Sequence, residues 1–288
     1  MIGPRPASNP SFQALLRSEL FKAVHHPSNR RLLALPALGL LVYAGLCALS
    51  HGPSRGHVLQ AGLDALDPLA FVLQFGLGAM LVLIASRTVA QEYHLGTIQV
   101  LIGRGVGRVR LLLAQVASFA ILAVGSLAIG VAAGCVLALL LVPGLAASLH
   151  TMPAVFWRDA GLNLAATSLS IAACLLLGAF VAALTRSSGV SLAMAVAWMP
   201  VENLLVLLIG VVVSVTNADG LMQLSAYLLS PNLNLLPQAL APWRQVPIFL
   251  ATPLVDVGWA HVVAVTIAYL VLFLGGSILL TWRRDVTH

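Results

Sequence analysis

The residue types that bind nucleotide phosphates are almost absent from this chain. Lys22 is the only lysine, and it stands in Glu-Leu-Phe-Lys-Ala-Val with no glycine beside it. A P-loop needs a lysine on the phosphates within G-x-x-x-x-G-K-[ST]. The glycine cluster at 103–107 does not match a dinucleotide fingerprint, because arginine stands at position 108 and no strand is expected before it. We therefore predict no ATP site and no cofactor in this chain.

The other candidates for catalysis or metal binding form no pattern. Cys47, Cys135 and Cys174 all lie inside apolar runs, where cysteine packs as a small side chain. His25 and His26 are far in sequence from the other histidines. No paired carboxylates and no Ser/His/Asp arrangement occupy a plausible pocket. We predict no catalytic residue, no metal ligand and no enzymatic activity.

One carboxylate, Glu202, lies in the middle of a strongly apolar segment, in the run Trp198-Met199-Pro200-Val201-Glu202-Asn203. A charged side chain at the centre of a bilayer costs at least about 2.5 kcal/mol, so Glu202 should face the interior of a helix bundle. Pro200 frees a backbone carbonyl one turn earlier. Three roles stay open for Glu202: a proton or cation site, hydrogen bonds across a helix or dimer interface, or the lining of a substrate path.

Other polar residues in the apolar segments are uncharged. They are Gln74, Asn163, Thr167, Ser168 and Ser170. These residues could line a cavity, although such side chains more often bond between helices, for ~0.6 kcal/mol on average.

The elements that position these residues can be predicted from composition. Of the 288 residues, 60% are hydrophobic and 8% are charged, whereas a soluble domain has ~45–50% apolar and ~25% charged residues. The apolar runs are continuous, which excludes a β-barrel, and a helix needs roughly 20 residues to cross the bilayer. We predict an all-α membrane protein with six spans, near 32–50, 68–86, 111–142, 161–184, 190–215 and 260–282. The third run is overlong, so its helix is tilted, or broken near Gly130 or Gly134.

The basic residues orient these spans. Six spans place both termini on one side, and twelve of the fifteen basic residues lie on that side. They are Arg5, Arg17, Lys22, Arg30, Arg31, Arg87, Arg104, Arg108, Arg110, Arg186, Arg283 and Arg284. The opposite loops hold Arg55, Arg158 and Arg244. The positive-inside rule therefore predicts cytoplasmic termini, with residues 1–31 and 283–288 in the cytoplasm. Basic residues divided among four short segments argue against a nucleic-acid surface.

Residues 11–26 have apolar side chains at helical spacing, and Pro27 ends the run. We predict an amphipathic helix along the cytoplasmic leaflet, with Arg17, Glu19 and Lys22 among its polar residues. It is either a membrane anchor with basic residues on lipid headgroups, or a helix that also contacts a cytoplasmic partner.

The cytoplasmic loop 87–110 is the most informative segment. Ile98, Leu101 and Ile102 recur at helical spacing after Gly96-Thr97, which predicts a break and then a short second helix. A short helix between two spans, parallel to the membrane, could transmit a movement from a cytoplasmic partner to both spans.

This combination of features resembles the permease subunit of ABC-2 type transporters. The amphipathic N-terminal helix, the six spans, the Glu-x-x-x-Gly-Thr element and the turn into the third span are similar to that family. The matching residues are Glu92, Gly96, Thr97, Arg104, Gly105, Val106 and Arg108. The resemblance implies that residues 91–102 form a coupling helix seated in an ATP-binding subunit. Two departures are Gly107, where serine is common, and Gln115, where the family often has a lysine.

The resemblance also implies the assembly and the direction of transport. It implies two copies of a separate ATP-binding subunit that carry ATP and Mg, a second permease copy (most simply a homodimer), and export across a prokaryotic inner membrane. The loop 216–259 would be extracytoplasmic. Its Leu221, Leu224, Tyr227 and Leu228 predict a short helix in the outer leaflet, and we expect Pro231 and Pro237 to break the chain beyond it.

Three other functions stay open. An ion-coupled secondary transporter would show inverted repeats and more than one ionisable residue within the membrane, whereas only Glu202 stands out. An intramembrane enzyme would need a nucleophile and a base at matched depth. A non-transporting scaffold or sensor subunit is the third alternative.

Overall fold

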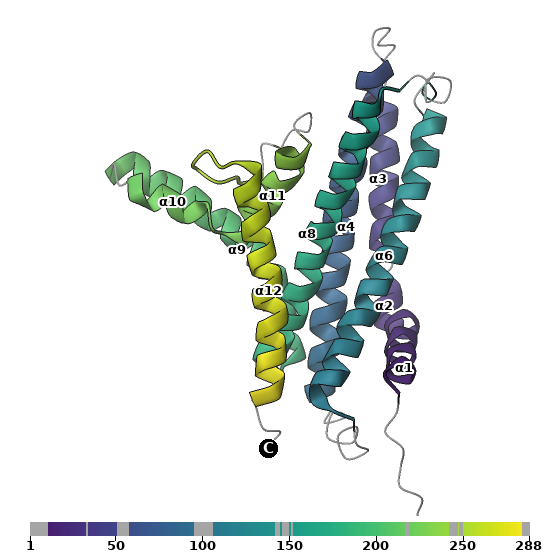
Figure 1. The fold of residues 1–288 in the computed structure, drawn as a ribbon, viewed down its shortest axis with the longest axis vertical. Helices are drawn as coiled ribbons and strands as arrows, with labels where there is room; N and C mark the ends of the chain where they lie inside the picture. The colour runs from purple at the N-terminus through teal and green to yellow at the C-terminus, as the bar shows by residue number, and fades with distance from the viewer. Residues whose placement is uncertain are drawn as a thin grey trace, which may run out of the picture.

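The computed structural model describes residues 11–32, 34–50, 58–94, 106–141, 145, 150, 152–216, 219–241, 247 and 250–283. Every regular element in these ranges is a helix, and Figure 1 shows most of the long helices side by side in an elongated bundle. The long helices are α3 (Leu35–Ser50), α4 (Val58–His94), α6 (Arg108–Leu141), α8 (Ala154–Thr185), α9 (Ser188–Thr216) and α12 (Trp259–Arg283). The all-α prediction is therefore confirmed for the described residues.

Five stretches in the described residues are long and apolar enough to cross a membrane. They are Leu66–Glu92, Arg108–Leu141, Ala154–Thr185, Ser188–Thr216 and Trp259–Arg283. The chain is therefore a multi-pass helical membrane protein, and these stretches overlap five of the six predicted spans. The first predicted span coincides with α3, which has 16 residues and is not among the five.

Helix α4 lies at the centre of the packing. It makes its most extensive contacts with α8 and also packs against α3, α6 and α9. The close approach of α4 and α8 depends on Gly178, because a Cβ at that position would lie 2.8 Å from the carbonyl oxygen of Val82. In the most apolar part of α4, 72% is buried inside the protein, compared with 17% for α6. The core is thus built around α4.

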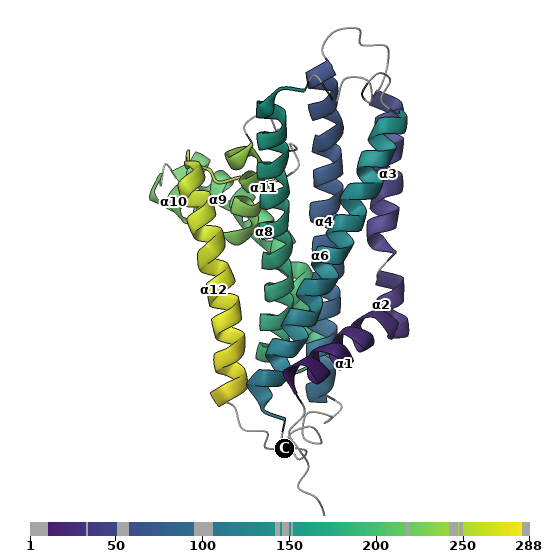
Figure 2. The same cartoon turned by 45° about the vertical axis from the view of Figure 1, so that its right-hand side comes forward.

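Helix α6 continues without a break through Gly130 and Gly134, the two positions at which the sequence allowed a break. Gly130 and Gly134 instead make room for two side chains of α4, because added Cβ atoms would collide with Leu73 and Leu69. Figure 2 shows α6 crossing the bundle obliquely. The overlong third run is therefore one continuous, inclined helix of 34 residues.

The predicted N-terminal helix is α1 (Phe12–His25), and the short α2 (Pro27–Leu32) comes next. The hydroxyl of Ser11 caps α1 by accepting from the Ala14 amide at 3.2 Å. Figure 2 shows α1 lying across the lower end of the bundle, where it packs against α6. Leu15, Glu19 and Ala23 are the buried residues of α1. Their spacing of four residues defines the face that contacts the protein.

Two segments differ from the sequence-based prediction. We predicted that the second span ends near residue 86, but α4 continues to His94. The expected break at Pro231 and Pro237 is wrong, because both lie inside α11 (Leu229–Leu240), which comes after η2 (Asp219–Leu221) and α10 (Met222–Ser225). Figure 1 shows α9 leaning away from the bundle toward α10. The chain then returns, and α11 packs against α8, α9 and α12.

Candidate functional site

An ion-pair cluster joins α1 to the lower end of α4. The Nζ of Lys22 lies 2.6 Å from Oε1 of Glu19 and 3.2 Å from Oε1 of Glu92. The Glu19 side chain is 3% exposed and that of Glu92 is 12% exposed, whereas Lys22 remains 47% exposed. One lysine therefore pairs with two acids that are largely buried, one on its own helix and one on α4.

The electrostatics of Lys22 result from this geometry. Partial burial alone lowers the pKa of Lys22, because it disfavours the charged form. The hydrogen bond to Glu19 and the negative charges of Glu92 and Glu19 outweigh burial, so the pKa of Lys22 lies above its ordinary value. Lys22 therefore stays charged throughout the physiological pH range.

The structure places only some of the predicted coupling residues. Glu92 lies in the last turn of α4, and Arg108 is the first residue of α6. Four others, Gly96, Thr97, Arg104 and Gly105, lie outside the described residues, as does most of the predicted coupling helix. Arg17 is exposed on α1. The sequence does not predict the contact between Lys22 and Glu92, because the two residues are 70 positions apart. The only indication of this contact in the sequence is that the 11–26 helix and the 87–110 loop contain residues of opposite charge.

The buried carboxylate of Glu202 is fully engaged. Its side chain lies inside the protein, with the residue 8% exposed. Oε1 accepts a hydrogen bond from Nε1 of Trp198, one turn earlier on α9, at 2.9 Å. Oε2 accepts from the backbone amide of Ser230 at the start of α11. Glu202 is therefore buried between α9 and α11, and one of its two hydrogen bonds joins these helices.

Glu202 acts as the N-terminal cap of α11. Leu228 occupies the capping position and has no side chain that could form the bond. The first amides of a helix need an acceptor, and the positive end of the helix dipole favours a negative charge. The carboxylate of α9 supplies both to the amide of Ser230. Nothing in the sequence alone indicates this pairing, because the two residues belong to different elements.

Prolines inside α11 create a second link to the bundle. Pro237 has no N–H, so the carbonyl of Leu233 lacks its usual partner within the helix. The side chain of Gln74 on α4 fills this position, with Nε2 donating to the Leu233 oxygen at 3.1 Å. Pro231 stands third in α11, within the first turn, where the missing N–H costs little. Both prolines are therefore compatible with a helix buried against its neighbours.

An amide cluster continues the contact between α9 and α11. Oδ1 of Asn203 accepts from Oγ of Ser230 and from Nδ2 of Asn234, each at 3.2 Å. Nδ2 of Asn234 also donates to the carbonyl of Ala251 at 2.8 Å. Pro200 lies one turn earlier in α9 and is exposed. Glu202 and Asn203 thus both bind α11 to α9, whereas Pro200 is not part of the cluster.

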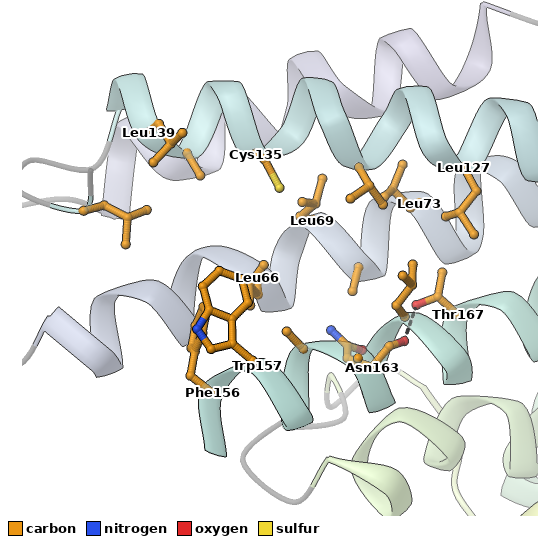
Figure 3. A pocket seen from close by; sticks show the side chains of 17 residues that line it. Leu66, Leu69, Leu73, Leu127, Cys135, Leu139, Phe156, Trp157, Asn163 and Thr167 are labelled. Carbon is orange, nitrogen blue, oxygen red and sulfur yellow. Dashed lines mark hydrogen bonds between the residues drawn. The ribbon is translucent and has the colours of Figure 1, made fainter. Parts of the chain in front are cut away.

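An apolar cleft of about 520 Å³ lies between α4, α6 and α8, away from the α1 end. Figure 3 shows leucines of α4 and α6 facing Phe156 and Trp157 of α8 across it. Asn163 and Thr167 are its polar residues, and Oγ1 of Thr167 donates to the Asn163 carbonyl at 2.9 Å. Its volume lies in the usual range of small-molecule pockets, ~300–1,000 Å³. The cleft suits an apolar occupant.

The polar residues of the fourth predicted span fall into separate environments. Asn163 and Thr167 line the apolar cleft, and Ser168 is exposed, with its hydroxyl on the Leu164 carbonyl. Ser170 and Gln74 line a second, smaller cavity. In the described residues, no group of three or more His, Cys, Asp or Glu side chains could hold a metal ion.

Comparison with known proteins identifies a family for this chain but does not indicate an activity. No curated protein matches the chain. A family model matches residues 51–287, which is most of the sequence and all five candidate spans. The chain belongs to the family described as protein of unknown function DUF2705.

Proposed function

We propose that this chain is the permease subunit of an ABC-2 type exporter, which forms a translocation path and couples to separate ATP-binding subunits. In this proposal six helices cross a prokaryotic inner membrane, with α3 as the first, and both termini are cytoplasmic. The partners are two ATP-binding subunits, which hold ATP and Mg, and a second permease copy. The proposal is supported by the five candidate spans and by the residues of the 87–110 segment that resemble the family.

The observation that carries the proposal is the ion pair between Lys22 and Glu92. It joins α1 to the end of α4, immediately before the segment expected to contact an ATPase. The start of α6 and the end of α12 lie at this same end of the bundle (Figure 2). A push on the 95–105 segment would therefore reach α1 and α4 together. Buried Glu19 and Leu15 would pass the motion on to α6, against which α1 packs.

The apolar cleft gives the proposal a place for an apolar substrate. It lies between helices proposed to cross the membrane, so lipid-soluble molecules could enter it directly from the bilayer. Lipids, antibiotics and hydrophobic peptides share the required chemistry. Movement of α4 driven from the α1 end would change the shape of the cleft, because α4 forms one of its walls.

An ion-coupled transporter is the second candidate, and Glu202 is the residue that would serve it. Both carboxylate oxygens of Glu202 are occupied by N–H donors of α9 and α11. A carboxylate that binds and releases a transported ion in each cycle would have to break these bonds every time. We therefore favour a structural role for Glu202. A scaffold or sensor subunit would differ from a permease in having no ATPase partner.

The test is affinity purification of the chain from a membrane extract, with identification of co-purifying proteins and measurement of ATP hydrolysis. We expect a P-loop ATPase in the complex. The Glu92→Ala, Arg108→Ala double variant should lose assembly or stimulated hydrolysis while remaining inserted. Arg158→Ala is the control, because Arg158 lies in the first turns of α8, at the other end of the bundle, and pairs with Asp159. Absence of any ATPase from the purified material would reject the proposal.

A further inference from the structure

A second cavity, of about 350 Å³, lies between α4, α8, α9 and α11. It begins on α4 at Gln74, immediately after the stretch that borders the apolar cleft. Its walls are mostly apolar and include Phe75, Val82 and Met199. Several hydrogen-bonding side chains from different helices also face it, namely Gln74, Ser170, Asn203 and Asn234.

Ser170 is the first sign that this cavity accepts a ligand. The residue is 2% exposed, and its Oγ has no hydrogen-bond partner in the described part of the chain. Other hydroxyls of α8 behave differently, since Thr167, Ser168 and Thr185 each donate to the carbonyl four residues earlier. A buried hydroxyl without a partner is costly. The Ser170 hydroxyl is therefore available to a molecule in the cavity.

Asn203 and Gln74 offer complementary groups. Oδ1 of Asn203 already accepts two hydrogen bonds, so this side chain has its NH₂ group left to offer. Gln74 has the opposite arrangement, because its NH₂ donates to the Leu233 carbonyl and leaves its oxygen as an acceptor. The cavity thus presents hydrogen-bond donors at Ser170 and Asn203 and an acceptor at Gln74.

The charge of the cavity defines the ligand further. None of its lining residues is acidic or basic, and the neighbouring Glu202 is bound to Trp198 and Ser230. An ion would be poorly solvated here, whereas a hydroxyl can both accept from a donor and donate to an acceptor. We propose that this cavity is a binding site for a compact, uncharged alcohol with an apolar body. This site stands independently of the ATPase partner.

The test uses the purified full chain in lipid nanodiscs and octan-1-ol that carries a diazirine. We expect saturable photolabelling of peptides from 74–83, 170–174 or 195–203, as these segments line the cavity. Cyclohexylmethanol should compete for the site, and methylcyclohexane, which has the same skeleton without the hydroxyl, should not. Labelling that is non-saturable, or that spreads evenly over all helices, would overturn the proposal.

Two variants test the assignment of residues. Ser170→Ala should weaken binding about three- to tenfold, the range of one hydrogen bond inside a membrane protein. Ser168→Ala is the matched control, because Ser168 is exposed on the same helix and bonds to its own backbone. Ala79→Leu should abolish saturable labelling by filling the cavity, and Ala79 is exposed, so the fold should tolerate it. Wild-type affinity in both the Ser170 and the Ala79 variants would refute the site.

Discussion

Replacing Glu202 with glutamine should loosen the N-terminus of α11 while α9 stays helical. Both oxygens of the carboxylate are acceptors, one for Nε1 of Trp198 and one for the amide of Ser230. Glutamine has one acceptor oxygen, and its NH₂ group can only donate. One of the two N–H donors is therefore left without a partner in a buried place.

The magnitude can be worked from the two bonds and the helix end. A hydrogen bond to a charged group contributes about 1.5–3 kcal/mol, and a charge at a helix N-terminus contributes about 0.3–1 kcal/mol. Glutamine retains one neutral bond, so we expect a loss of about 2–3 kcal/mol in the free energy of opening α11. Glu202→Ala should cost more, because it removes both acceptors.

Hydrogen exchange in detergent or nanodiscs measures this loss at the residue concerned. The amide of Ser230 should exchange at least tenfold faster in Glu202→Gln, since 1.4 kcal/mol corresponds to a factor of about ten. A double-mutant cycle with Trp198→Phe should show coupling, because both changes act on the same carboxylate. Ser214→Ala is the control, as Ser214 is an exposed residue of α9 that bonds to its own helix.

One result would refute the capping argument. If the Ser230 amide exchanges at the wild-type rate in both Glu202→Gln and Glu202→Ala, the carboxylate does not hold α11. Additive effects of the Glu202 and Trp198 changes would likewise show that the bond between them contributes nothing.

Three further predictions concern the ends and the centre of the bundle. Lys22→Met should weaken the protection of α1 amides against hydrogen exchange by about 1–2 kcal/mol, because it removes a half-exposed cation from two largely buried acids. Arg17→Gln should leave this protection unchanged. Because the pKa of Lys22 is raised in the folded protein, its contribution to stability is complete below the unfolded pKa of about 10.4 and is lost as pH rises through the higher folded pKa. The difference in melting temperature between wild type and Lys22→Met should therefore be constant from pH 7 to 9. It should disappear as the pH rises above about 10.4. Gly178→Leu should cost about 1–3 kcal/mol of stability or more. Gly161→Leu on the same helix should cost little, because open space surrounds Gly161. Equal melting temperatures of these two variants would contradict the close packing of α4 on α8.

The sequence was sufficient for features that depend on local composition. Continuous apolar runs predict membrane helices because each helix satisfies its own backbone, and five of the six predicted runs overlap candidate spans. The inward orientation of Glu202 could be predicted from the cost of exposing a carboxylate to lipid. The helix at 11–26 could be predicted from apolar spacing and from Pro27, which begins α2.

Features that depend on distant partners could not be predicted. The prolines at 231 and 237 indicate a break, and only the side chain of Gln74, more than 150 positions away, removes the cost of the second one. Glu19 has the composition of a polar surface residue on an amphipathic helix. It is buried because its face of α1 packs against α6, and Lys22 lies beside it. In both cases the three-dimensional neighbour decides the outcome, and one sequence contains no record of that neighbour.

The bond between Gln74 and the Leu233 carbonyl makes two distant positions interdependent. The glutamine has an acceptor there because Pro237 cannot supply the usual amide. A homologue with a non-proline residue at 237 would close that helical bond itself, and a glutamine at 74 would lose its partner. Across the family, proline at 237 and a donor at 74 should therefore be gained and lost together, which makes this pair a marker for relatives that share the buried α11.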